Sequence, residues 1–250
     1  MKITVIGAGA IGGNLAKLLS DAGHDVLVAD ARGPGAVPAE ALDAGARAVE
    51  LDGSTTGREV VVLSVPFSVQ PQLAQLVAAA PDDAVVVDTA NYYPQLTGPH
   101  EAADSGRVES LWVQEQLGRP IAKAWNAALA ETQRTQGRPA GSPGRIALPV
   151  AADSDDARRT VMALVDDTGF DPFDAGELAE SWRQQPGTPA YCTELTLDEL
   201  GAALGSADKE AAPVNRDRLM AHYASLTESL DREGVVARNR AGTAPGSTTY

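Results

Sequence analysis

The feature that most constrains this chain is its opening stretch, in which an apolar strand leads directly into a glycine-rich turn. Residues 2–6 (KITVI) predict a short strand, and residues 7–12 (GAGAIG) complete the pattern G-x-G-x-x-G. Residues 14–22 then place leucines at helical spacing. The pattern therefore stands in the context of strand, turn and helix that distinguishes a dinucleotide-binding turn from a merely flexible glycine loop.

Each glycine of this turn has a physical role in binding a dinucleotide. Gly7 permits the sharp turn out of the strand, Gly9 leaves bare backbone for a pyrophosphate, and Gly12 lets the helix approach the sheet. The helix N-terminus adds unpaired N–H groups and a partial positive charge. A second strand at residues 25–29 ends at Asp30, about 20 residues on, where such folds bind the adenosine ribose.

The rest of the first 176 residues alternates between strands and helices. Buried-type strands rich in valine are predicted at residues 59–64 and 84–88, with a helix at 69–80 between them. This rhythm indicates parallel pairing with right-handed crossovers, so the expected fold class is α/β with a Rossmann doubly wound parallel sheet. Residues 92–107 are expected to form a long polar loop.

After residue 176 the pattern changes to helices. We expect residues 1–176 to form an NAD(P)-binding Rossmann domain, residues 177–235 a small helical C-terminal extension, and residues 236–250 a disordered tail. A predicted helix at 216–230 carries an apolar stripe, and this stripe could form a homodimer contact or pack on the parent domain. Its members are Leu219, Tyr223, Leu226 and Leu230.

Composition excludes several classes of function. The formal net charge of -14 argues against nucleic acid and anionic membrane as partners. Cys192 is the single cysteine and the three histidines are far apart in the sequence, so no metal site is expected. With no signal peptide and no apolar run of membrane-spanning length, we expect a cytoplasmic protein.

The order of several motifs identifies a resemblance to a known family. VIGAGAIG, then Arg32, VVLSVPF, VVVDTAN and AKAWNAAL follow one another as in the NADP oxidoreductases that use the deazaflavin coenzyme F420. The same Rossmann module occurs as the nucleotide domain of the STEAP metalloreductases, and the resemblance extends to about residue 183. It implies direct hydride transfer between the nicotinamide and a stacked deazaflavin or flavin, without a metal or a general acid or base.

The resemblance also implies a set of cofactor-binding residues. Arg32 would bind the adenosine 2′-phosphate of NADP, whereas Asp30 favours the ribose diol of NAD, so NADP is expected and NAD remains an alternative. Three groups of residues would surround the rest of the cofactor. They are Gly7, Gly9, Ala10, Ile11 and Gly12 at the pyrophosphate, Val65, Pro66 and Phe67 at the ribose and adenine, and Ala90, Asn91 and Ala124 at the nicotinamide.

Lys123 and Asn126 are the candidate catalytic or substrate-positioning residues, because they follow a predicted strand at residues 119–124 whose end can reach the reacting ring. A surface ion pair for Lys123 and a helix cap for Asn126 are the simpler alternatives. The hydride acceptor is expected to be a small molecule. Two further functions stay open, an imine or β-hydroxyacid-type reductase and a non-catalytic NAD(H)-sensing module.

Overall fold

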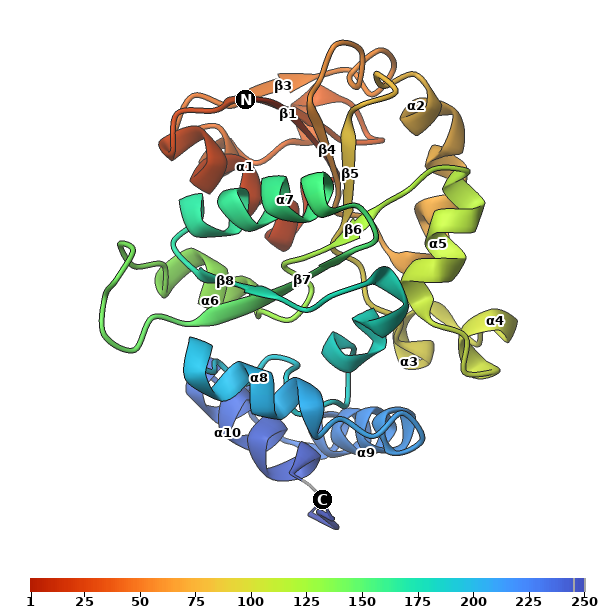
Figure 1. Cartoon of the computed structure of the whole chain (residues 1–250), viewed down its shortest axis with the longest axis vertical. Helices are drawn as coiled ribbons and strands as arrows, with labels where there is room; N and C mark the ends of the chain where they lie inside the picture. The colour runs from red at the N-terminus through yellow and green to blue at the C-terminus, as the bar shows by residue number, and fades with distance from the viewer. Residues whose placement is uncertain (245, 250) are drawn as a thin grey trace.

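The structure is a computed structural model that describes residues 1–244 and 246–249. Its strands form one sheet in the order β3-β2-β1-β4-β5-β6-β7-β8 (Figure 1). From β3 to β6 all neighbours pair in parallel, which confirms the α/β Rossmann prediction. The bounds are β1 (Lys2–Ile6), β2 (Asp25–Ala29), β3 (Arg47–Val49), β4 (Val60–Leu63), β5 (Val85–Asp88), β6 (Ala122–Lys123), β7 (Ala147–Ala152) and β8 (Asp171–Asp174).

One pair of strands departs from the prediction of purely parallel pairing. β7 runs antiparallel to β6, with Ala122 opposite Ala152. The connection between these strands contains one short helix, α6 (Ala130–Thr135), rather than a crossover that returns the chain to the opposite edge. β7 therefore begins at the edge where β6 ends. α7 (Asp155–Asp167) then provides a normal crossover, and β7 and β8 are parallel.

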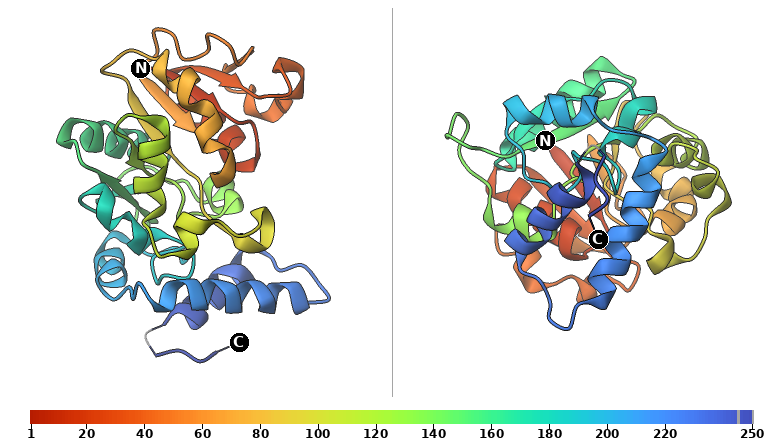
Figure 2. Two further views of the ribbon diagram at one scale, coloured as in Figure 1. Left: turned by 90° about the vertical axis from the view of Figure 1, so that its right-hand side faces the viewer. Right: turned by 90° about the horizontal axis from the view of Figure 1, so that it is seen from below.

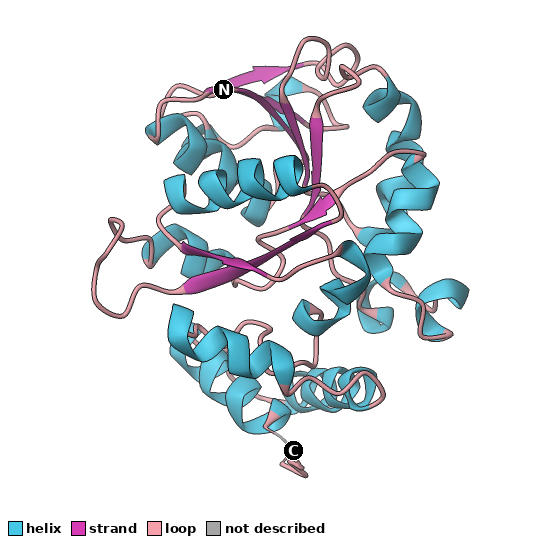
Figure 3. Ribbon diagram, viewed as in Figure 1, coloured by secondary structure: helices cyan, strands magenta, loops and turns pink. Residues whose placement is uncertain are grey.

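The sheet is buried on both faces, which explains the continuous apolar run of β4. Val60 and Val62 belong to one hydrophobic core, and Val61 and Leu63 belong to the other. The first core is covered by α1 (Ala10–Asp21) and α7, and the second by a 3-10 helix η3 (Phe67–Leu73), α2 (Ala74–Ala78) and α5 (Glu109–Leu117) (Figure 3). Shorter helices are η1 (Pro34–Ala36), η2 (Ala39–Ala41), α3 (Pro94–Thr97) and α4 (Glu101–Asp104).

The helical C-terminal extension is confirmed. It contains η4 (Leu178–Gln184), α8 (Leu197–Gly205), α9 (Ala211–Ser225) and α10 (Arg232–Thr243). Helices α8 to α10 lie beyond the ends toward which β1, β4 and β5 run, so they face the edge where a Rossmann fold binds its ligand (Figures 1 and 2). No helix in the described ranges is long and apolar enough to cross a membrane. The predicted loop at 92–107 is wrong in part, since α3 and α4 lie within it.

The prediction of a disordered tail at residues 236–250 is wrong for its first part, because α10 extends to Thr243. Asp231 caps this helix by accepting a hydrogen bond from the Gly234 N–H at 2.8 Å. The sequence lacks apolar periodicity there, and tertiary contacts stabilise the helix instead. Gly242 packs against Leu219 of α9 so closely that an added Cβ would lie 2.8 Å from the leucine. Positions 245 and 250 lie outside the described residues.

The predicted apolar stripe is divided by the end of α9. Leu219 is buried under α10, and the Tyr223 hydroxyl donates to Asn239 Oδ1 at 2.7 Å. Leu226 and Leu230 lie after the helix has ended at Ser225. The first half of the stripe therefore packs on its own chain, and dimerisation stays a prediction.

Candidate functional site

The glycine-rich turn has the geometry that pyrophosphate binding requires. A Cβ added to Gly7 would lie 2.2 Å from the Ser64 carbonyl oxygen, and one added to Gly12 would lie 2.0 Å from the Gly7 carbonyl oxygen. Both positions are therefore restricted to glycine by close backbone approach. A Cβ added to Gly9 would meet nothing within 4 Å, so the space above this residue is open.

The start of α1 is also free to bind an anion. Gly9 is its N-cap residue and no side chain caps the helix, so the first N–H groups lack side-chain acceptors. A hollow of about 340 Å³ adjoins this turn and is lined by Gly9, Ala10 and Asn14, with Lys17 and Arg134 among its other lining residues. Glu40 and Asp43 line the same hollow, so its charged side chains balance, and the N–H groups at the start of α1 are the feature that favours an anion. The open space above Gly9 and the uncapped start of α1 are compatible with the predicted pyrophosphate site.

Asp30 and Arg32 form an ion pair at the end of β2. The Arg32 Nε donates to Asp30 Oδ1 at 2.8 Å, and the same carboxylate accepts from the backbone N–H groups of Ala8 and Arg32. These hydrogen bonds, that of the guanidinium first, lower the pKa of Asp30 to about 2. The Arg32 side chain is 71% exposed, so it can turn toward a ligand without leaving a buried site.

The three residues expected at the ribose and adenine lie in the turn after β4 and differ in their exposure. Val65 is half-buried and Pro66 is exposed, so both can contact a ligand. Phe67 is only 1% exposed and stacks on Trp112 with ring centroids 4.7 Å apart. Phe67 therefore supports the turn from behind rather than presenting its ring to the cleft.

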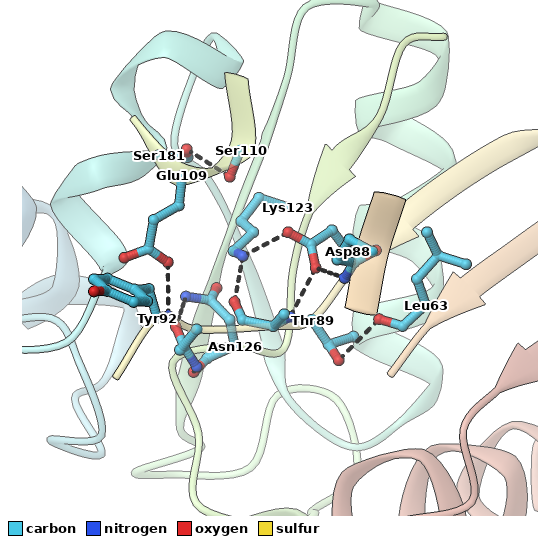
Figure 4. A network of polar contacts seen from close by, with 12 residues as sticks. Leu63, Asp88, Thr89, Tyr92, Glu109, Ser110, Lys123, Asn126 and Ser181 are labelled. Carbon is cyan, nitrogen blue, oxygen red and sulfur yellow. Dashed lines mark hydrogen bonds and ion pairs between the residues drawn. The ribbon is translucent and has the colours of Figure 1, made fainter. Parts of the chain in front are cut away.

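A buried ion pair lies under the turn that follows β5 (Figure 4). Lys123 Nζ lies 2.7 Å from Asp88 Oδ2 and also donates to the Ala90 carbonyl oxygen, and both charged side chains are fully buried. Asp88 Oδ1 accepts from the Ala90 N–H and from Gln70 Nε2, each at 2.8 Å. The surface-pair alternative for Lys123 is therefore wrong. Lys123 instead holds the Ala90 backbone in place through its hydrogen bond to the Ala90 carbonyl oxygen.

Asn91 and Asn126 are brought together at the ends of β5 and β6. Asn91 Nδ2 donates to the Asn126 carbonyl oxygen at 2.9 Å, and Asn126 Nδ2 donates to Asn91 Oδ1 at 3.0 Å. Ala124 is fully buried beneath them. Trp125, also fully buried, has a φ of 57°, an uncommon conformation for a bulky residue, and this turn directs Asn126 toward Asn91.

The C-terminal extension completes this arrangement with Gln184, which the sequence offered as a residue that could line the far wall of the pocket, and with Tyr191, which the sequence patterns did not identify. Gln184 Nε2 donates to Asn126 Oδ1 at 2.8 Å, and the Tyr191 hydroxyl lies 3.2 Å from Asn91 Nδ2 and 3.0 Å from the Tyr93 hydroxyl. We call this set the amide–tyrosine wall. Its members are Asn91, Tyr93, Asn126, Gln184 and Tyr191.

A buried carboxyl lies at the backbone of Tyr92, the residue between Asn91 and Tyr93 of the wall. Glu109 is 5% exposed, and its Oε2 accepts from the Tyr92 N–H at 3.0 Å (Figure 4). Burial raises its pKa to about 7, opposed by the positive charge of Lys123. Glu109 also lines a small cavity of about 70 Å³ together with Trp182 and Arg216. No group of residues able to hold a metal ion is found among the described residues.

Comparisons with known proteins agree with this geometry. Residues 2–92 match the family described as NADP oxidoreductase, coenzyme F420-dependent. The chain is 41% identical over 102 residues to the protein YjhV of Escherichia coli strain K12, covering 41% of this chain and 74% of YjhV. The solved structure of protein SMa0349 from Sinorhizobium meliloti is 31% identical with a TM-score of 0.60, covering 72% of this chain and 87% of that one. A structure from Arthrobacter sp. FB24, named as a candidate F420-dependent NADP reductase, has 22% identity and a TM-score of 0.58, covering 90% and 95% of the two chains.

Proposed function

This chain belongs to the family of NADP oxidoreductases described as coenzyme F420-dependent, and we propose that it transfers a hydride between NADP(H) and a planar acceptor such as a deazaflavin or a flavin. The observation that carries this proposal is the open space above Gly9, between two glycines whose Cβ atoms have no room. A pyrophosphate can approach the backbone at that point, beside the uncapped start of α1.

In this proposal Arg32 binds the 2′-phosphate that distinguishes NADP from NAD. A guanidinium matches phosphate geometry well, and the exposed pair with Asp30 is weak enough to be exchanged for a phosphate contact. With Arg32 on the phosphate, Asp30 keeps its backbone hydrogen bonds to Ala8 and Arg32. Asp30 then acts as the fixed end of the second strand rather than as the selectivity residue.

The nicotinamide end of the site is proposed to lie against the amide–tyrosine wall. When bound, the reduced cofactor supplies the hydride. The residues of this chain position both rings and exclude water, and the buried Asp88–Lys123 pair fixes the Ala90 backbone on which that position depends. Because Lys123 is fully buried in this pair, it does not serve as a proton donor to an acceptor, which favours an acceptor that needs only a hydride.

A second candidate function is reduction of a small imine or carbonyl compound. The observation that favours it is the pair of hydroxyls of Tyr93 and Tyr191, 3.0 Å apart in the wall, because burial raises the pKa of both phenols and keeps them protonated. A protonated hydroxyl can donate a hydrogen bond to a carbonyl oxygen. Rates with deazaflavin, flavin, imine and carbonyl acceptors, measured side by side, separate the two functions.

The cofactor part of the proposal is tested by Gly9→Ala. Gly9 has φ −70° and ψ −173°, which alanine adopts readily, and the added methyl meets no protein atom within 4 Å, so the fold is retained. The methyl does occupy the approach of a pyrophosphate, and we expect NADPH affinity to fall at least about tenfold. Gly205→Ala is the matched control, since its Cβ also meets nothing within 4 Å and it lies at the end of α8.

Calorimetric titration measures the binding and thermal unfolding checks the fold. Gly12→Ala provides the opposite case, because its Cβ would lie 2.0 Å from the Gly7 carbonyl oxygen and the protein itself should be destabilised. Wild-type affinity for NADPH in Gly9→Ala would show that the cofactor does not lie on this turn.

A further inference from the structure

The segment that carries Tyr191 into the wall has an unusual backbone. Cys192 has a φ of 53° and Glu194 a φ of 50°, so two residues with side chains adopt the left-handed conformation within three positions. Such a conformation persists only where the surrounding structure fixes it, and it is concentrated at functional sites. The contacts of this segment therefore show what holds Tyr191 in place.

Helix α10 binds the carbonyl groups of this segment in succession. Asn239 Nδ2 donates to the Cys192 carbonyl oxygen at 3.2 Å. Arg240 donates to the next two carbonyl oxygens, those of Thr193 at 2.6 Å and Glu194 at 2.8 Å. The carboxylate of Glu194 is in turn paired with Arg232 at the start of the same helix. Helix α10 thus donates hydrogen bonds to the carbonyl groups of three consecutive residues, 192–194.

The opposite side of the segment is fixed to the Rossmann part. The Cys192 N–H donates to the Ala127 carbonyl oxygen at 3.0 Å, and Glu194 Oε1 accepts from the Thr132 hydroxyl at 2.6 Å. Tyr191 is half-buried, and its hydroxyl lies within hydrogen-bond distance of Asn91 and Tyr93. The segment is therefore held between α10 on one side and the loop after β6 together with α6 on the other, with the Tyr191 hydroxyl hydrogen-bonded to Asn91 in the turn after β5.

We propose that Tyr191 is a positioning and specificity-determining residue for the hydride acceptor, and that α10 is the latch that holds it there. This inference rests on the proposed function and adds a residue and a helix to it. Through its hydroxyl, Tyr191 restrains the Asn91 amide in its bonds to Asn126. Asn126 and Gln184 are buried, whereas Asn91, Tyr93 and Tyr191 are partly exposed. These three side chains are a neutral amide and two phenols, which suits a neutral ring edge bearing carbonyl and N–H groups rather than a carboxylate.

Two variants test the proposal, and each leaves the turn at Gly9 untouched. Tyr191→Phe keeps the ring and removes the hydroxyl that contacts Asn91. Arg240→Ala removes two of the latch hydrogen bonds. Arg238→Ala is the matched control, because Arg238 lies on the same helix and bonds to His222 and the Gly234 carbonyl instead of the segment.

We expect both test variants to raise KM for the acceptor about five- to tenfold, with a smaller change in kcat. The Kd of NADPH should change much less than this KM, because Gly9 and Arg32 are proposed to bind the other end of the cofactor. Arg238→Ala should match the wild type in KM. Hydrogen–deuterium exchange gives a second readout that needs no acceptor. In Arg240→Ala, exchange should accelerate in residues 191–194 and in the turn at residues 91–93, and in Arg238→Ala it should not.

The outcomes separate this inference from the function on which it rests. If the wild-type enzyme reduces neither deazaflavin nor flavin, the proposed acceptor class is wrong, while exchange still tests the latch. If the wild type turns over and Tyr191→Phe has the wild-type KM, Tyr191 does not position the acceptor. Unchanged exchange in a folded Arg240→Ala, as judged by thermal unfolding, overturns the role of α10.

Discussion

Replacing Arg32 with alanine tests how this protein selects its cofactor. The guanidinium is 71% exposed and makes two hydrogen bonds to Asp30, at 2.8 and 3.2 Å. A charge-assisted hydrogen bond to a phosphate changes an affinity roughly ten- to a hundredfold. Because the site is exposed and the Asp30 contacts must be given up, we expect the lower end of that range, about a tenfold weaker binding of NADPH by Arg32→Ala.

Binding of NADH should respond differently to the same substitution. NADH has no 2′-phosphate, and removal of the guanidinium leaves the Asp30 carboxylate with only its backbone partners, Ala8 and Arg32. A carboxylate in this position can accept hydrogen bonds from a ribose diol. We expect NADH affinity to stay constant or rise, so the preference for NADPH over NADH falls at least about tenfold.

Calorimetric titration of both cofactors at low salt measures this change, and the difference should shrink as ionic strength rises. Arg47→Ala is the control, because Arg47 is also an exposed arginine paired with an aspartate, Asp25, but lies at the other end of the same strands. NADPH binding by Arg32→Ala within twofold of the wild type would refute the reasoning.

Three further predictions follow from the buried groups. Lys123→Ala leaves Asp88 buried without its partner, so the free energy of unfolding in urea should fall by about 3–5 kcal/mol, and a loss below about 1 kcal/mol would contradict this account. Burial raises the pKa of Glu109 from 4.5 to about 7, so the free energy of unfolding of the wild type should decline as pH rises from 4.5 to about 7. Urea unfolding midpoints measured at pH 5 and pH 8 should therefore differ in the wild type, and Glu109→Gln should remove this difference. Burial raises the pKa of Cys192 to about 12, so iodoacetamide should modify it only after unfolding, and rapid native-state labelling detected by mass spectrometry would show that the segment opens.

The first half of the fold could be predicted because its signals are local. The strand, turn and helix around Gly9 lie within about twenty residues, and the valine run of β4 is buried on both sides in the structure. The direction of β7 could not be predicted, because it depends on the path of the connection through α6 rather than on any pattern within the strand. Helix α10 was missed for a related reason. Its stability comes from contacts such as Gly242 against Leu219, which leave little periodicity in the sequence.

In the candidate site too, residues next to a strand end could be predicted, and residues placed by long-range contacts could not. Asn91 was expected at the nicotinamide from the family resemblance, and Asn126 near the reacting ring from its place after a strand. The structure places the two side chains in contact. The expectation for Lys123 did not include its partner, although Asp88 lies directly opposite Lys123 in the pairing of β5 with β6. Tyr191 carried no such signal, since it lies 100 residues from Asn91 and outside any regular element.

The hydrogen bonds from α10 to residues 192–194 also bear on the order in which parts of the chain can fold during synthesis. The turn around Gly9 is built from β1 and α1 and packs on Ser64 after β4, so it can form once β4 has left the ribosome. The wall needs Asn91 to meet Tyr191 across 100 residues, and Tyr191 in turn needs Asn239 and Arg240. The proposed cofactor turn can therefore be complete early in synthesis, whereas the proposed acceptor side is complete only after α10 has been translated and docked.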